Sequence, residues 1–284
     1  MKRLIWIGIL VPSLLQAQRL HLNLFGGFSN YSGDLQSKPF TLDQSYASFG
    51  LGAQYDLTPK FSLLTNFNYI HVGAADQFNK ASLVPRNLSF QTDIYEWNAL
   101  AEYNFFDLSR SRVTPYVFAG LGIFHFDPYA YDSLGNRVYL HPLSTEGEGL
   151  QQYPDQKPYN LFQVAIPFGG GVKFRISEGV VIAYEVNFRK LFTDYLDDVS
   201  TRYVDQTILL NARGPQAVEM AYRGGEVKNG NPVYPPDGTK RGGSEYKDWY
   251  YTSGIRISIA INSQRPTWKN GVSVTRAARC SVGS

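Results

Sequence analysis

Residues 91–105 read Gln91-Thr92-Asp93-Ile94-Tyr95-Glu96-Trp97-Asn98-Ala99-Leu100-Ala101-Glu102-Tyr103-Asn104-Phe105, and two kinds of side chain alternate along them. Successive side chains of an extended chain point to opposite sides. Tyr95, Trp97 and Tyr103 therefore share one face, and Glu96, Asn98 and Glu102 share the other. The segment is predicted to be a β-strand with an apolar face and a polar, charged face.

The same period of two recurs in seven other segments of similar length. The eight predicted strands cover residues 19–28, 46–56, 60–71, 91–105, 113–126, 161–175, 180–192 and 249–262. At roughly 3.3 Å per residue and a tilt of about 40°, each is long enough to cross the ~25 Å apolar layer of an outer membrane.

The links between these strands alternate strictly between short and long. Short turns at 56–59, 107–112 and 177–179 separate long links at 29–45, 73–90, 127–160 and 193–248. This pattern predicts an all-β fold: a transmembrane eight-stranded antiparallel up-and-down β-barrel with long external loops and short periplasmic turns. The last link is rich in Gly, Pro and charge from Arg223 to Gly243, and we expect it to be mobile.

Alternation alone does not distinguish a membrane barrel from a soluble sandwich or barrel, which would bury the apolar face instead. Two features favour the membrane. The apolar faces end in aromatic residues, as the girdles of outer-membrane barrels do, and the polar faces carry both signs of charge in mid-strand. The aromatic residues concerned are Tyr95, Trp97, Tyr103, Trp249 and Tyr251.

The two ends of the chain indicate export. Lys2 and Arg3 precede an apolar run from Leu4 to Leu15, and Ala17 follows as a small residue suited to cleavage, so residues 1–17 are predicted to be a signal peptide. We expect an outer-membrane β-barrel over 18–263 and a basic periplasmic tail over 264–284. This assigns the protein to the cell outer membrane.

Composition argues against several other classes of function. The net charge of +3 includes Lys2 and Arg3, so the processed chain is close to neutral and nucleic acid is not expected as a partner. Cys280 is the only cysteine, which excludes an intrachain disulfide and a cysteine zinc site. None of the four histidines has a serine two residues later, as the outer-membrane deacylase mechanism requires. We therefore predict that the protein is not an enzyme and has no catalytic residue, cofactor, metal site or small-molecule substrate. Of the functions considered, a lipid-modifying enzyme is the one that the sequence favours least.

Charged residues on the polar faces form a candidate set for the barrel lumen. They could line an ion path, or they could neutralise one another as a salt-bridged plug. We favour the plug, because eight strands enclose little more than side chains and an unpaired buried ion is costly. The set comprises Glu96, Glu102, Lys173, Arg175, Glu185, Arg189 and Arg256.

Several aspartates follow the seventh predicted strand, namely Asp194, Asp197, Asp198 and Asp205. Clustered carboxylates can bind calcium, but the spacing lacks the glycine-centred loop of an EF-hand. We therefore expect a solvated, hydrogen-bonding loop here.

Four segments together resemble the PorG-like outer-membrane barrels of Bacteroidota, over roughly residues 20–260. They are Tyr31–Leu35, Asp93–Ala99, Pro115–Gly122 and Phe192–Ser200, of which the last, with Asp194, Asp197 and Asp198, is the most specific. The resemblance implies a structural subunit of the type IX secretion system, associated with a periplasmic ring of the PorK lipoprotein and PorN. The chain departs from this pattern at its end, which is not an aromatic strand terminus.

The alternative is a stand-alone small outer-membrane barrel that acts as an adhesin, a ligand-binding protein or a narrow pore. Outer-membrane lipid and lipopolysaccharide surround the barrel in either case. Crosslinking from intact envelopes would distinguish a subunit of a complex from a solitary barrel.

Overall fold

The computed structural model describes residues 20–36, 41, 43–228, 230–245 and 247–261, together with two short strands at 267–269 and 272–274. The predicted signal peptide with its cleavage site at Ala17, and Cys280, lie outside the described residues.

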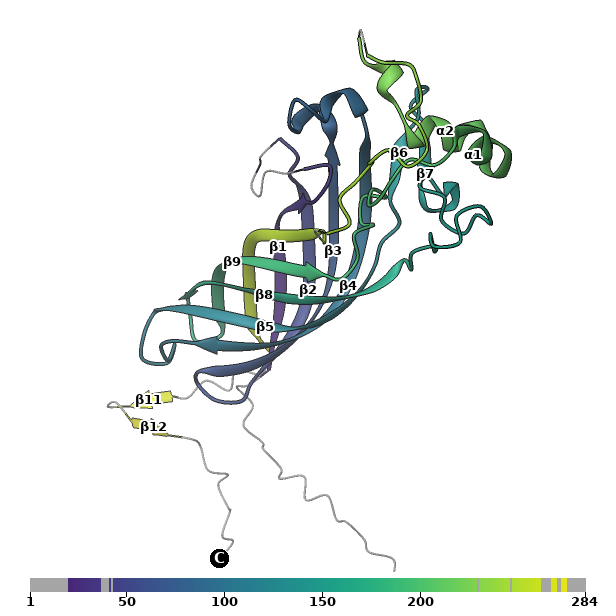
Figure 1. Cartoon of the computed structure of the whole chain (residues 1–284). Coiled ribbons are helices and arrows are strands. Elements are labelled where there is room, and N and C mark those ends of the chain that lie inside the picture. The colour runs from purple at the N-terminus through teal and green to yellow at the C-terminus, as the bar shows by residue number, and fades with distance from the viewer. Residues whose placement is uncertain are drawn as a thin grey trace, which may run out of the picture.

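Eight long antiparallel strands form one closed sheet, which confirms the predicted fold class (Figure 1). They are β1 (Leu20–Ser32), β2 (Tyr46–Asp56), β3 (Phe61–Ala75), β4 (Ser89–Asn104), β5 (Val113–His125), β8 (Phe162–Arg175), β9 (Val180–Leu191) and β10 (Trp249–Ala260). The first strand pairs with both the second and the last, so the sheet has no free edge along the barrel. Consecutive long strands are neighbours, as in an up-and-down barrel.

The shorter elements lie in the long links, at one end of the barrel (Figure 1). They are η1 (Asp76–Phe78), η2 (Val84–Arg86), β6 (Tyr129–Tyr131), β7 (Arg137–Tyr139), η3 (His141–Leu143), α1 (Gln206–Arg213), α2 (Pro215–Ala221) and η4 (Gly224–Glu226). Within the predicted tail, β11 (Thr267–Lys269) and β12 (Val272–Val274) pair with each other. No helix among the described residues has the length and apolar character needed to cross a bilayer.

Two strands run four residues further than predicted. β1 continues to Ser32 and β3 to Ala75, whereas the alternating pattern ends at Phe28 and His71. The pattern marks only the apolar outer belt. Beyond the belt, backbone pairing with β10 and β4 continues the strands, whose apolar residues there, such as Val72 and Ala74, face inward into the cap core.

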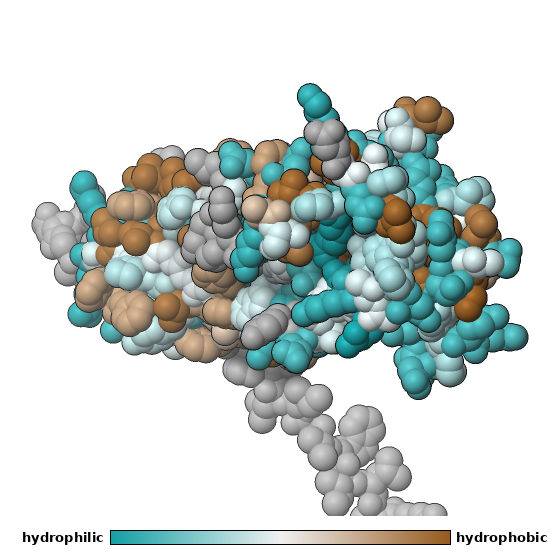
Figure 2. Space-filling model, turned by 45° about the horizontal axis from the view of Figure 1, so that its top comes forward, coloured by the Kyte–Doolittle hydropathy of each residue, from teal (hydrophilic) through white to brown (hydrophobic). Residues whose placement is uncertain are grey.

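The side chains have the orientation expected of a membrane barrel. On β4, Trp97 is 50% exposed on the outer wall, whereas its neighbour Glu96 is completely buried in the lumen. The same holds around the sheet, where Phe49, Phe67 and Val164 are exposed. Figure 2 shows hydrophobic colours over the barrel wall and mainly hydrophilic colours over the external loops. A broad exposed apolar belt of this kind is typical of a surface that lipid covers.

The four long links fold together into one body, here called the cap: the described residues of 33–45, 76–88, 126–161 and 192–248. Its apolar side chains, including Leu35, Leu88, Leu140 and Leu196, join inward-facing residues at the ends of the barrel strands in the larger of two hydrophobic clusters. The first part of the last link, ahead of the Gly-rich stretch, is packed, because it contributes two helices and buried apolar residues to the cap. Mobility of the stretch from Arg223 to Gly243 stays a prediction.

Local sequence explains these two helices. Asp205 caps α1 by accepting a hydrogen bond from the Ile208 amide at 2.9 Å. Pro215 occupies the first turn of α2, where its missing N–H is harmless. Leu209 and Met220 point into the cap core, so burial on one side stabilises helices too short to be stable alone.

Candidate functional site

The lumen of the barrel is filled by two layers of buried charge. The layer nearer the cap centres on Glu96 of β4, which pairs with Arg189 of β9 at 3.1 Å. Tyr250 also donates a hydrogen bond to this carboxylate at 2.8 Å, as does Asn68 at 2.9 Å. A carboxylate buried in this way stays ionised because a guanidinium and neutral donors replace its water.

The second layer lies nearer the short turns and centres on Glu102. This carboxylate bridges Lys173 of β8 and Arg256 of β10. Arg256 also pairs with Glu185 at 3.3 Å, and Tyr116 donates a hydrogen bond to Glu185 at 2.7 Å. The network therefore ties together β4, β5, β8, β9 and β10 across the lumen.

The two layers balance in charge, with three carboxylates, Glu96, Glu102 and Glu185, against three cations, Lys173, Arg189 and Arg256. All six side chains are buried. Neutral pairing is the condition under which buried charge is tolerated, and it leaves no net charge to attract a permeating ion.

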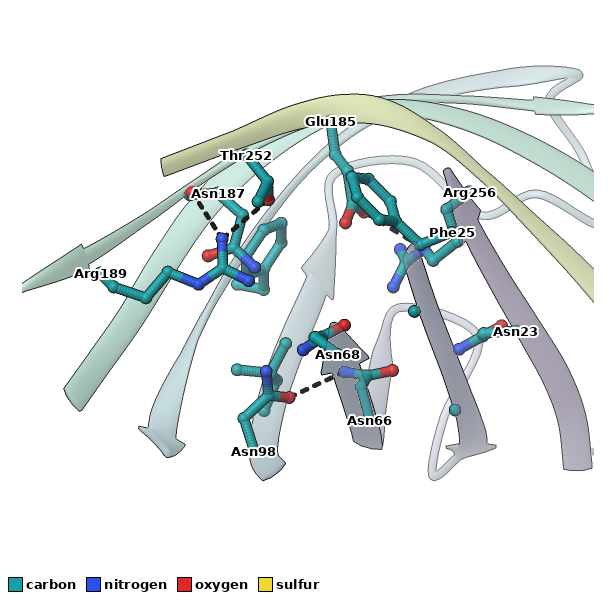
Figure 3. A pocket seen from close by; sticks show the side chains of 14 residues that line it. Asn23, Phe25, Asn66, Asn68, Asn98, Glu185, Asn187, Arg189, Thr252 and Arg256 are labelled. Atoms are coloured by element: carbon teal, nitrogen blue, oxygen red, sulfur yellow. Dashed lines mark hydrogen bonds and ion pairs between the residues drawn. The ribbon is translucent and has the colours of Figure 1, made fainter. Parts of the chain in front are cut away.

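A small cavity of about 20 Å³ remains between the layers (Figure 3). Amide side chains dominate its wall, including Asn23, Asn66, Asn68, Asn98 and Asn187, and Asn66 donates a hydrogen bond to Asn98 at 2.9 Å. A cavity of this size has room for about one water molecule. The lumen therefore consists of side chains, not of a channel.

Arg175, which we expected in the lumen set, does not join the layers. It is the last residue of β8, and its guanidinium donates a hydrogen bond to the Ser109 carbonyl at 3.2 Å in the neighbouring short turn. Alternation correctly gives the face on which a residue lies, but not its depth along the barrel.

The aspartates after β9 are not solvated, contrary to expectation. Asp194, Asp197 and Asp198 are all buried under the cap. Asp194 accepts a hydrogen bond from Ser200 at 2.8 Å, and Asp198 accepts one from Tyr159 at 2.8 Å. These carboxyl groups therefore belong to the packed interior of the cap.

Two segments that carry the family resemblance, 31–35 and 192–200, meet at this point. The Tyr31 hydroxyl lies 2.6 Å from an oxygen of Asp197 and 2.8 Å from an oxygen of Asp248. A side chain at Gly33 would collide with both Tyr31 and Asp248, so only glycine fits there. Leu35 and Leu196 are both buried in the cap core. The two segments thus join the first and last long links through hydrogen bonds and apolar contacts.

The two short contacts of Tyr31 favour a neutral acid at this point. A tyrosine hydroxyl carries one proton, and two ionised carboxylates this close would repel each other. A proton on Asp197 or Asp248, donated to the tyrosine oxygen, accounts for both contacts. In agreement, burial raises the pKa of both Asp197 and Asp248 well above the usual range, and their mutual repulsion adds to the effect on Asp197.

Sequence reasoning missed the remaining charged groups of the cap. Glu146 accepts hydrogen bonds from the Ser200 and Thr201 amides at 2.9 and 2.7 Å and pairs with Arg241 at 3.0 Å. Arg241 also donates to the Asp198 carbonyl at 2.5 Å. These contacts join different links, so no local pattern marks them.

The stability of the cap should depend on pH because, among the residues that the structure describes, two of its buried carboxyl groups have no cation paired with them. Burial raises the pKa of Asp194 to about 7, and burial with repulsion from Asp198 and Glu146 raises that of Glu148 to about 8. The closed cap thus binds protons that an opened cap releases, so its stability is complete below about pH 4 and is lost progressively up to about pH 8. Hydrogen exchange of the cap amides, corrected for intrinsic rates, should show at least tenfold more frequent opening at pH 8.5 than at pH 5.5.

Glu148→Gln is the matched variant for this measurement, because it keeps the shape of the side chain and removes its titration. Its cap should open with a weaker pH dependence than the native cap. Opening that is equally frequent at both pH values in the native protein would contradict the assignment.

The described residues contain no group of three or more His, Cys, Asp or Glu side chains arranged to hold a metal ion. Two histidines instead form single pairs with carboxylates: His21 with Asp56 at 2.9 Å in the lumen, and His71 with Asp93 at 2.7 Å on the outer wall.

Comparison with known proteins identifies a family and finds distant similarity to solved structures. Residues 2–209 match the family model described as "Domain of unknown function (DUF6089)". None of the functionally curated proteins matches the sequence. Among solved structures, Neisserial surface protein A is 11% identical, with a TM-score of 0.42, over 85% of this chain and 97% of that one. Outer membrane protein OprG from Pseudomonas aeruginosa is 10% identical, with a TM-score of 0.41, and Ail, the attachment invasion locus protein of Yersinia pestis, is 10% identical, with a TM-score of 0.40. Each covers 85% of this chain and 97% of its own.

Proposed function

Since the chain belongs to the DUF6089 family, whose members share a domain of unknown function, we propose its role from the barrel itself. We propose that it is a structural subunit of an outer-membrane protein secretion apparatus of type IX, in contact with a periplasmic ring of the PorK and PorN type. The resemblance of segments 31–35 and 192–200 to PorG-like barrels suggests the apparatus.

The main support for a structural role, and against transport through the barrel, is that the lumen is filled and electrically neutral. Six buried ions satisfy one another, and about 20 Å³ is left between them. No polypeptide passes through such a lumen. A barrel of this kind acts as a rigid body whose ends and outer wall contact other molecules.

The outer-membrane location rests on the exposed apolar wall. Leu51, Trp97, Leu121 and Ile123 are each at least half exposed, and they lie on strands whose other faces are polar. Exposing this much apolar surface to water is unfavourable, whereas lipid covers it at no cost. A closed sheet also satisfies every strand amide at membrane depth.

Site-specific crosslinking tests the proposed contact with the ring. A photoreactive residue at Ser109, in the exposed turn between β4 and β5, should capture a ring protein in intact envelopes. The same residue at Leu134, an exposed position in the β6–β7 hairpin of the cap, is the matched control and should not. Deletion of the gene should abolish secretion of the apparatus's cargo, and unchanged secretion would overturn the proposal.

The second candidate is a stand-alone barrel whose external face binds a partner or ligand. The observation in its favour is the cap, a folded body packed on a hydrophobic core that it shares with the ends of the barrel strands.

A narrow pore is the form of this hypothesis that conductance measurements can test. The purified barrel in planar bilayers should show no stable open channels, because both charge layers cross the lumen. Channels of ordinary porin conductance would refute the plug.

A further inference from the structure

A second cavity lies outside the lumen, at the cap end of the barrel, where residues of the cap meet the ends of β3 and β4. Its volume is about 200 Å³, roughly ten times that of the cavity between the charge layers. The ends of β3 and β4, the adjoining loops and β6 line it. Its floor is made of small or flat apolar side chains, Ala74, Phe90 and Ala130. The cavity is therefore a shaped depression with a packed base.

Among the aromatic rings that line the cavity, two are largely open to solvent. Phe78 of η1 is 45% exposed and Tyr131 of β6 is 41% exposed. Aromatic faces carry negative charge density and attract the weakly positive hydrogens of C–H bonds. They therefore suit a ligand with a flat array of C–H groups.

The rest of the lining supplies hydrogen-bonding groups. Asp43, Gln77 and Ser89 line the cavity, and in the described part of the chain their side chains bond to no other protein group. A carboxylate, an amide and a hydroxyl together accept and donate hydrogen bonds in several directions. An apolar floor with a few such polar groups is the usual composition of a small-molecule site.

The position of the cavity indicates where its ligand resides. On the outer wall of β3 and β4, the apolar belt at Phe67 and Trp97 gives way to the His71–Asp93 pair, to which Tyr69 also donates a hydrogen bond at 2.7 Å. The cavity begins at Ala74, roughly 10 Å further along β3. It therefore faces the level just outside the lipid hydrocarbon, where headgroups lie.

We propose that this side cavity binds one ring of a saccharide at the outer surface of the membrane. A sugar ring offers both features that the lining fits: a C–H face for Phe78 and Tyr131, and hydroxyl groups for Asp43, Gln77 and Ser89. The proposal rests on the outer-membrane location proposed above. The saccharide is either the headgroup of a glycolipid in the outer leaflet or a free oligosaccharide.

The test uses the full barrel in phosphatidylcholine nanodiscs, titrated with the deacylated core oligosaccharide of lipopolysaccharide and followed by calorimetry. In a second arm, a photoreactive residue at Gln77 is illuminated in nanodiscs that contain intact lipopolysaccharide. Binding in the first arm supports a free saccharide as the ligand, and capture in the second arm alone supports the glycolipid. If neither arm shows binding, the proposal is overturned.

Two variants test whether the saccharide binds in this cavity. Phe78→Ala combined with Tyr131→Ala should weaken binding or capture at least tenfold. Tyr139→Ala is the matched control, because Tyr139 is an equally exposed tyrosine of β7 that does not line the cavity. Equal binding by the double variant and the native protein would contradict the site, provided that gel mobility before and after heating shows both barrels folded. The measurement needs no partner protein, so its failure leaves the proposed contact with the ring untouched, and the reverse also holds.

Discussion

Glu102→Ala is expected to lower the free energy of unfolding of the barrel by about 3–5 kcal/mol. Glu102 is completely buried and bridges Lys173 and Arg256. Arg256 keeps its second carboxylate, Glu185, but Lys173 would be left buried without a counter-ion. The unpaired ammonium group, more than the lost contact, accounts for the size of the effect.

Equilibrium unfolding in denaturant, followed by tryptophan fluorescence in lipid vesicles, measures this loss. Glu178→Ala, at an exposed position in the turn between β8 and β9, is the control and should cost less than about 0.5 kcal/mol. Adding Lys173→Met to Glu102→Ala removes the stranded charge and should recover most of the lost stability. A single variant as stable as the control would show that the layer does not stabilise the barrel.

The barrel could be predicted from sequence because its physics is local. Each strand faces the polar lumen on one side and the apolar exterior on the other, so the period of two is present in every strand and needs no knowledge of its neighbours. The lumen set follows from the same period, and in the structure Glu96 and Arg189 are buried on the inner face of the barrel. It also included Arg175, because alternation does not report how far along the barrel a residue lies.

The cap could not be predicted in this way. Tyr31 and Asp248 are 217 residues apart and meet only because the barrel brings their links together. Glu146 and Arg241 are 95 residues apart and meet for the same reason. Polar residues in such links resemble solvated loops when read one segment at a time, which explains why buried aspartates were expected to be solvated.

The same arrangement makes Arg241 the residue on which the cap depends most. The cap buries seven carboxyl groups: Asp76, Glu146, Glu148, Asp194, Asp197, Asp198 and Asp248. Arg86 pairs with Asp76, and Arg241 pairs with Glu146 at 3.0 Å and lies 3.8 Å from Asp198. Without Arg241, Glu146 and Asp198 would repel each other in a site that excludes water.

Arg241→Leu should therefore open the cap, at a cost of about 3–5 kcal/mol, while the barrel stays folded. Limited proteolysis of the protein in nanodiscs should cut within α1 or α2 at least a hundredfold faster than in the native protein, since a tenfold change corresponds to about 1.4 kcal/mol. Lys228→Leu, which removes an exposed positive charge from the same link, is the matched control and should be cut at the native rate. The barrel should keep its unheated gel mobility in both variants, because its charge layers do not include Arg241. Unaltered cutting of Arg241→Leu would mean that the apolar core of the cap holds the links together without this ion pair.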